Sequence, residues 1–376
     1  MSQDKQIMND LTAETILRRS IQKVATGPEY SKDLSFDDAR DAMKHILEGA
    51  DPVQAAIFFI ALRMKRESND ENEGILQAIM DHSGHITADV DELVDIADPY
   101  DGYARGVPAS PFLAPVLAAC GVAAISHGAE NIGPKYGATH YKVLKAAGKN
   151  VDLSPEAAAA QIANADIGWA YLDQRQYNPG LHSLLDLRAR MIKRQVMTTV
   201  EVLVGPVRAH NKTHLLTGYV HKAYPPIYAR LARHAGFDSA MIVRGVEGGI
   251  IPSLQQAGKL WYYHDKADEQ VLELDPALAG IQQESRAVPI PDSVPAAAGQ
   301  KDEIDSAVDI DALSQAAAKM GIEALSGKTG PTRDSLVYSG AICLHHLARH
   351  DSLQSAADAV RKVLDSGEAL ERFQRA

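Results

Sequence analysis

The sequence predicts an α/β protein with a small helical lobe, residues 1–90, and a larger lobe, residues 91–376, built on a mostly parallel sheet flanked by helices. Two observations lead to this prediction. Apolar residues recur at helical spacing through residues 11–85, whereas from Leu93 onward short apolar runs alternate with helices, as in a parallel sheet. A helical insertion at about 154–196 is expected to pack on the helical lobe.

Capping residues mark the helix starts of the first lobe. Ser35 stands before one helix, and Ser68 with Glu71 forms a capping box before another. Asp51-Pro52 starts the helix between them, because proline is favoured at the first helical position. That middle helix is apolar almost all round, so we expect it to be buried on more than one side.

The second lobe reads as strands connected by helices. The predicted strands are Ala123–Ser126, Val200–Val204, Leu215–Val220 and Met241–Arg244. The predicted helices are Thr139–Ala147, Pro225–Ala235 and two more between Asp334 and Arg375. Residues 286–302, rich in proline, alanine and aspartate, are expected to form a mobile surface connection.

Composition restricts the class of protein. The net charge of −11 over 376 residues argues against a protein that coats nucleic acid or anionic membrane indiscriminately. Two cysteines, Cys120 and Cys343, lie in apolar contexts and are expected to be reduced. The polar start and the lack of a long apolar run predict a cytoplasmic protein without a membrane partner.

A tight loop after the first strand of the second lobe is the first candidate ligand site. Asp98-Pro99 and Asp101-Gly102 are turn dipeptides at the carboxyl end of a strand, where α/β proteins usually bind ligands. Ser110 lies at the start of the next helix and could donate to a bound phosphate. Pro99 and Tyr100 make the loop a poor backbone cradle for pyrophosphate.

Several motifs then resemble one known family along nearly the whole chain. They are Phe58–Lys65 in the helical lobe, Ser126-His127-Gly128, Tyr177–Gly180 with Arg188, Gly205-Pro206, and the tail Leu364–Leu370. Together these are similar to anthranilate phosphoribosyltransferases. The resemblance implies a nucleoside phosphorylase/phosphoribosyltransferase-like fold, a homodimer formed through the helical lobe, and a cleft between the lobes that binds phosphoribosyl pyrophosphate or a nucleotide.

Candidate site residues follow from matching positions. The expected ligand or phosphate contacts are Asp101, Gly102, Arg105, Ser110, His127, Gly128 and Lys135. The expected acceptor or nucleic-acid contacts are Tyr177, Asn178, Arg188 and Arg190. Alternatives stay open for several of them: Arg105 as a solvated loop residue, His127 as a packed histidine, Lys135 on an exposed face. Glu247 is read as a ribose contact or as a turn residue.

The catalytic motifs depart from the family pattern. Its glycine-rich loop is replaced by Ala97–Gly102, and its magnesium-binding acidic pair by Ile250 and Ile251, whose side chains have no oxygen to offer a hard cation. No catalytic residue and no metal ligand is assigned. No cofactor is required by this reading, although Mg²⁺ could still accompany a ligand. Anthranilate transfer is expected to be lost or weak.

Four functions remain open. The first is a family protein that binds a phosphoribosyl or nucleotide-type anion. The second is a non-catalytic homologue that binds single-stranded nucleic acid, since Tyr100–Arg105 and Leu184–Arg190 resemble a nucleic-acid-binding branch of the family. The third is a true anthranilate phosphoribosyltransferase of tryptophan biosynthesis. The last is a structural dimer with a vestigial cleft.

Overall fold

The computed structural model describes residues 3–299 and 306–376, and the chain divides into two compact units. One unit comprises Met1–Gly84 with Asn178–Val204, and the other His85–Tyr177 with Gly205–Ala376. The predicted two-lobe α/β architecture is therefore present. The structure ends the first segment at Gly84 and assigns Asn178–Val204, not all of 154–196, to the helical unit.

The helical unit is built from helices throughout. They are α1 (Gln3–Val24), α2 (Phe36–Leu47), α3 (Pro52–Lys65), α4 (Asn69–Asp81), α9 (Pro179–His182), α10 (Leu185–Met191), α11 (Met197–Val200) and the 3-10 turn η2 (Glu201–Leu203). The Ser35 hydroxyl accepts from the backbone N–H of Asp38, and Ser68 and Glu71 form the predicted capping box. The predicted strand Val200–Val204 is wrong, because this β-branched run is helical here.

One face of α3 is open, contrary to the sequence prediction. Phe58, Phe59 and Leu62 are fully buried, whereas Ile57 is 45% and Met64 79% exposed. Both faces are apolar, so the sequence alone could not tell which one packs within the unit.

The α/β unit contains a seven-stranded sheet of order β4-β3-β2-β6-β7-β8-β9. Its strands are β2 (Glu92–Ala97), β3 (Ala124–Gly128), β4 (Trp169–Asp173), β6 (Lys212–Gly218), β7 (Ser239–Val243), β8 (Gly258–Tyr263) and β9 (Gln270–Leu274). The pairs from β4 to β7 are parallel, and β8 and β9 add antiparallel pairs. A separate parallel pair joins β1 (Ile86–Thr87) to β5 (Val207–Arg208).

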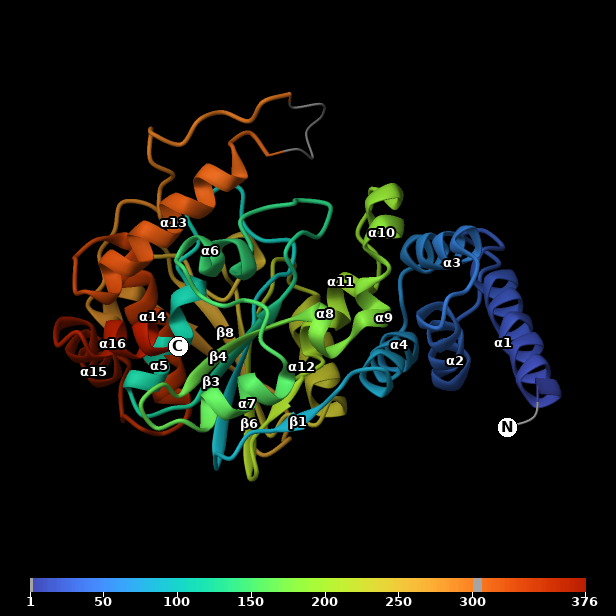
Figure 1. Ribbon diagram of the computed structural model, residues 1–376, viewed down its shortest axis with the longest axis horizontal. Coiled ribbons are helices and arrows are strands. Elements are labelled where there is room, and N and C mark those ends of the chain that lie inside the picture. The colour runs from blue at the N-terminus through green and yellow to red at the C-terminus, as the bar shows by residue number, and fades with distance from the viewer. Residues whose placement is uncertain (1–2, 300–305) are drawn as a thin grey trace. The chain divides into compact units, whose positions relative to one another are not determined.

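Helices cover this sheet and complete the core. They are η1 (Ser110–Phe112), α5 (Leu113–Ala119), α6 (His140–Ala146), α7 (Pro155–Ala163), α8 (Gln174–Tyr177), α12 (Tyr224–His234), η3 (Val246–Gly248), η4 (Pro276–Ala279), α13 (Ile310–Leu325), α14 (Pro331–His346), α15 (Leu353–Asp365) and α16 (Glu368–Arg375). Helices α5 and α13–α16 gather on one side of the sheet (Figure 1). The tail thus forms three helices, one more than the sequence predicts, because a bend at Ser366-Gly367 separates α15 from α16.

Other predictions from the sequence have clear outcomes. The predicted strand at Ala123–Ser126 and helix at Thr139–Ala147 are β3 and α6. Cys120 and Cys343 are free thiols. Residues 286–299 lie largely outside helices and strands, and the rest of the predicted connection, 300–302, is outside the described residues. In the described ranges no helix combines the length and apolarity needed to cross a membrane.

Candidate functional site

The loops at the carboxyl edge of the parallel sheet hold most of the predicted ligand residues. Strands β2, β3, β4 and β7 run in the same direction, so the segments that follow Ala97, Gly128, Asp173 and Val243 emerge at one edge of the sheet. These segments build three neighbouring features: a buried aspartate, a hydrogen-bonded relay, and an anion seat.

The buried aspartate is Asp98, the first residue after β2. Its carboxylate accepts from the Tyr103 hydroxyl at 2.9 Å, the Ser110 hydroxyl at 2.5 Å, His140 Nε2 at 2.9 Å and the Ile250 backbone N–H at 3.0 Å. Burial alone would raise the pKa of Asp98, but the hydrogen bonds from His140, Ser110 and Tyr103 outweigh it and lower the pKa below its usual value. Ser110 is therefore committed to Asp98 within the chain.

The hydrogen-bonded relay connects Asp95, His127, Tyr100 and Tyr177. His127 Nε2 lies 2.7 Å from a carboxylate oxygen of Asp95, while its Nδ1 bonds the Tyr100 hydroxyl. Because Asp95 accepts from Nε2–H, Nδ1 accepts from Tyr100, whose oxygen in turn accepts from the Tyr177 hydroxyl at 2.7 Å. Both ring nitrogens of His127 are thus engaged, and Tyr100 fills the loop where a phosphate cradle needs small residues.

The anion seat lies on the segment that follows Gly102. The backbone N–H groups of Ala104 and Arg105 donate to the two carboxylate oxygens of Glu247, at 3.1 and 2.8 Å. Lys135 Nζ lies 3.8 Å from the same carboxylate and 3.4 Å from Asp101. Two consecutive backbone donors and a neighbouring ammonium are groups of the kind that bind phosphate. We call this set of groups the anion seat; in this structure it binds the carboxylate of Glu247.

Two predicted glycines serve the backbone of this region. Gly102 has φ +70°, and a Cβ there would lie 2.8 Å from the main chain of Ala138, so the turn requires glycine. A Cβ on Gly128 would stand 3.5 Å from the Tyr171 hydroxyl. Gly102 is therefore closed to a side chain, whereas a Cβ at Gly128 would make only an ordinary van der Waals contact, and the Arg105 side chain is exposed.

The positions that replace the family's metal ligands are part of the hydrophobic core. Ile250 is fully buried and Ile251 is 8% exposed. Hydrocarbon side chains cannot coordinate Mg²⁺, so the residues at these positions do not fit the metal. Within residues 3–299 and 306–376, no cluster of three or more His, Cys, Asp or Glu side chains could hold a metal ion.

The predicted acceptor residues of the helical unit have internal partners. Asn178 caps α9 by accepting from the Leu181 N–H at 2.8 Å, and its amide donates to the backbone of Ile79 at 3.0 Å. Arg188 makes a bidentate ion pair with Glu201 at 2.6 and 2.7 Å, and both side chains are 1% exposed.

Arg190 is the exposed member of this predicted set. Its guanidinium lies 3.4 Å from Asp186, one helical turn away, and both side chains are mostly exposed. Contacts of Tyr177, Asn178, Arg188 and Arg190 with a ligand, and a site between the lobes, stay predictions.

Three of the ligand residues predicted from the sequence lie close together in the structure. Asp101, Arg105 and Lys135 do come together, through side-chain and backbone groups. The role of Glu247 as their partner was missed, because 142 residues separate it from Arg105. Its one local signal is the surrounding glycines, which permit an irregular loop after a strand.

Sequence profiles of a single glycosyl transferase family match both units. Its helical bundle domain matches residues 18–83, and its a/b domain matches residues 104–288. The fold and this pair of domains define the class as a glycosyl transferase family protein.

Curated relatives and solved structures agree with this class. Anthranilate phosphoribosyltransferase of Petrotoga mobilis is 26% identical over 94% of each chain, and an uncharacterized protein of Aquifex aeolicus is 28% identical over 63% of this chain and 71% of its own. The Thermus thermophilus anthranilate phosphoribosyltransferase superposes with TM-score 0.71 at 20% identity, covering 96% of this chain and 97% of that one. The Saccharomyces cerevisiae enzyme, solved with phosphoribosyl pyrophosphate and magnesium, gives 0.72 at 18% and covers 96% of both. The chain belongs to this glycosyl transferase family, and the named relatives that it resembles are anthranilate phosphoribosyltransferases.

Proposed function

We propose that the protein binds a phosphoribosyl or nucleotide-type anion on the loop after β2, and that it does so without the family's metal pair. One observation carries the proposal: the N–H groups of Ala104 and Arg105, with Lys135 beside them, hold an anion, the carboxylate of Glu247. A phosphate presents oxygens of the same charge and hydrogen-bonding type. Phosphoribosyl pyrophosphate is the natural probe, because it occupies a solved relative.

Ordinary transfer is expected to be weak for two physical reasons. A magnesium ion normally neutralises the departing pyrophosphate, and Ile250 and Ile251 cannot hold one. Tyr100 is locked into the relay where a flexible cradle would close on the pyrophosphate.

Anthranilate transfer for tryptophan biosynthesis is the second candidate. It is favoured by the named relatives, such as the one from Petrotoga mobilis that aligns over 94% of this chain. The nucleic-acid alternative has less support, because Arg188, one of the basic residues on which it rests, forms a buried ion pair with Glu201. It stays a prediction.

A thermal-shift and turnover experiment separates the first two candidates. Saturating phosphoribosyl pyrophosphate is expected to raise the Tm, since a ligand at 100-fold its Kd contributes about 2.7 kcal/mol to stability. Adding anthranilate and Mg²⁺ is expected to produce little or no loss of anthranilate fluorescence compared with a known family transferase run in parallel as the positive control. Steady consumption of anthranilate would establish the second candidate, and an unchanged Tm would reject ligand binding.

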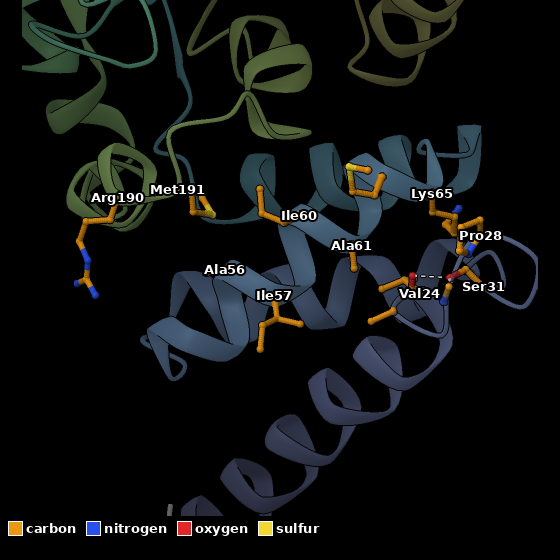
Figure 2. Close-up of a pocket in the computed structure, with 13 residues that line it drawn as sticks. Val24, Pro28, Ser31, Ala56, Ile57, Ile60, Ala61, Lys65, Arg190 and Met191 are labelled. Atoms are coloured by element: carbon orange, nitrogen blue, oxygen red, sulfur yellow. Dashed lines mark hydrogen bonds between the residues drawn. The ribbon is translucent and has the colours of Figure 1, made fainter. Parts of the chain in front are cut away.

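We further propose that the helical unit forms a homodimer through the open face of α3. A groove of about 650 Å³ runs along this face and is lined mainly by apolar side chains. Figure 2 shows Ala56, Ile57, Ile60 and Ala61 of α3 along it, with Val24, Pro28 and Ser31 toward one end and Met191 and Arg190 toward the other. Ile57 and Met64, which line this groove, are large apolar side chains left exposed to solvent, as at interaction surfaces. A second copy of the chain would bury it.

Ile57→Asp is expected to shift the protein from dimer to monomer in sedimentation analysis, because a charge would be desolvated at the contact. The matched control is Leu278→Asp, which changes an exposed leucine of the α/β unit and is expected to leave the dimer intact. A wild-type protein that sediments as a monomer at all concentrations would contradict this proposal.

A further inference from the structure

The contact between Glu247 and the anion seat joins two loops that emerge at the same edge of the sheet, one after β7 and one after β2. Glu247 follows β7 and reaches the segment that follows β2, where its side chain is 7% exposed. Its carboxylate makes two backbone hydrogen bonds, and Lys135 adds an ion pair at 3.8 Å. The Glu247 carboxylate thus occupies the same N–H and ammonium donors that a phosphate would need.

The backbone at Glu247 is itself strained. Its φ of +54° lies in the left-handed region, which a non-glycine residue adopts at a cost. The loop carries Gly245, Gly248 and Gly249 around it, and Gly248 has φ +85°. A strained residue among glycines can be released by rotation of a few backbone angles, because glycine adopts both signs of φ.

Charge makes Glu247 and an incoming phosphate mutually exclusive. The single ammonium of Lys135 already faces two carboxylates, Asp101 and Glu247. A phosphate added to this set would meet two negative charges at short range, whereas a phosphate that replaces Glu247 would keep both backbone donors and Lys135.

We propose that Glu247 is a tethered competitor: its carboxylate occupies the anion seat in the resting protein, and a phosphate or diphosphate group binds by displacing it. This inference rests on the proposed function and specifies how the same site is regulated. Because the carboxylate is intramolecular, it competes at a high effective concentration whatever the ligand concentration. The open seat is then a minor state, and the observed affinity is reduced by its population.

The test is calorimetric titration with inorganic pyrophosphate in EDTA, using wild type, Glu247→Ala and Glu247→Gln. Minor states of this kind are populated at about 0.1–10%, so removing the competitor is expected to tighten binding by about tenfold or more. Glu247→Gln keeps the size of the side chain and loses the charge, and it is also expected to bind pyrophosphate more tightly than wild type. Circular dichroism confirms that both variants are folded.

A third variant tests whether the gain in pyrophosphate affinity arises at the anion seat. Adding Lys135→Met to Glu247→Ala is expected to abolish the gain, because the phosphate then loses its neighbouring cation. If pyrophosphate binds wild type measurably and binds both Glu247 variants equally or more weakly, the proposal that Glu247 competes for the seat is wrong, while the anion site itself is supported. Absence of binding to every variant, the Glu247 pair included, would reject the anion site and with it the proposed function.

Discussion

Arg188→Ala is expected to destabilise the helical unit by about 3–5 kcal/mol, because it leaves the carboxylate of Glu201 buried without its partner. The guanidinium makes two hydrogen bonds of 2.6 and 2.7 Å to Glu201, and each side chain is 1% exposed. Solvent cannot replace the lost charge at such a position. Urea denaturation followed by circular dichroism measures the change.

Two further variants show that the loss comes from the unpaired carboxylate. Arg188→Met combined with Glu201→Leu removes both charges and is expected to cost much less than Arg188→Ala alone. Arg190→Ala breaks an exposed pair on the same helix and is expected to cost about 0.5 kcal/mol or less. Full stability of Arg188→Ala would show that the ion pair is not formed.

Asp98→Asn is expected to destabilise the α/β unit by about 2–4 kcal/mol, since an amide puts a donor among groups that all donate. Tyr103, Ser110, His140 and the Ile250 N–H each point a hydrogen at the two oxygens of Asp98. An asparagine can satisfy some of them through its single oxygen and must oppose the rest. Thermal denaturation at neutral pH measures the loss.

The pH dependence of this effect has a defined sign. Burial opposes ionisation of Asp98, but its hydrogen bonds lower the pKa in the folded protein below the unfolded value of about 3.9. The stabilisation is therefore complete above that pH and is lost as the pH falls through the folded pKa. The difference between wild type and Asp98→Asn is expected to shrink in acid. An exposed control, Asp265→Asn, is expected to show no comparable effect, and a pH-independent difference would contradict the ionised state of Asp98.

Elements of the fold that are marked by strong short-range sequence patterns could be predicted from the sequence. Ser68 with Glu71 and the short apolar run at β3 are short-range features, so the structure agrees with them closely. The run Val200–Val204 failed because β-branched residues are compatible with a helix when tertiary contacts favour it. A periodicity argument cannot separate the two for so short a segment.

The site was harder to predict because its contacts are long-range. Ser110 was correctly placed beside the loop, yet its hydroxyl serves Asp98, twelve residues away. Arg188 was assigned to a ligand, while Glu201 on a neighbouring turn engages its guanidinium. For Ile250 and Ile251 the sequence argument needs no long-range contact, since an apolar side chain cannot coordinate a metal ion whatever surrounds it.

We propose that this member of the family binds a phosphoribosyl anion without a metal. Calorimetric titration of the wild-type protein with phosphoribosyl pyrophosphate, once in EDTA and once in excess Mg²⁺, tests it most directly. We expect saturable binding in EDTA, with a Kd that changes by less than about threefold on adding Mg²⁺, because no acidic pair recruits the ion. Binding that appears only with Mg²⁺, or none under either condition, would contradict it.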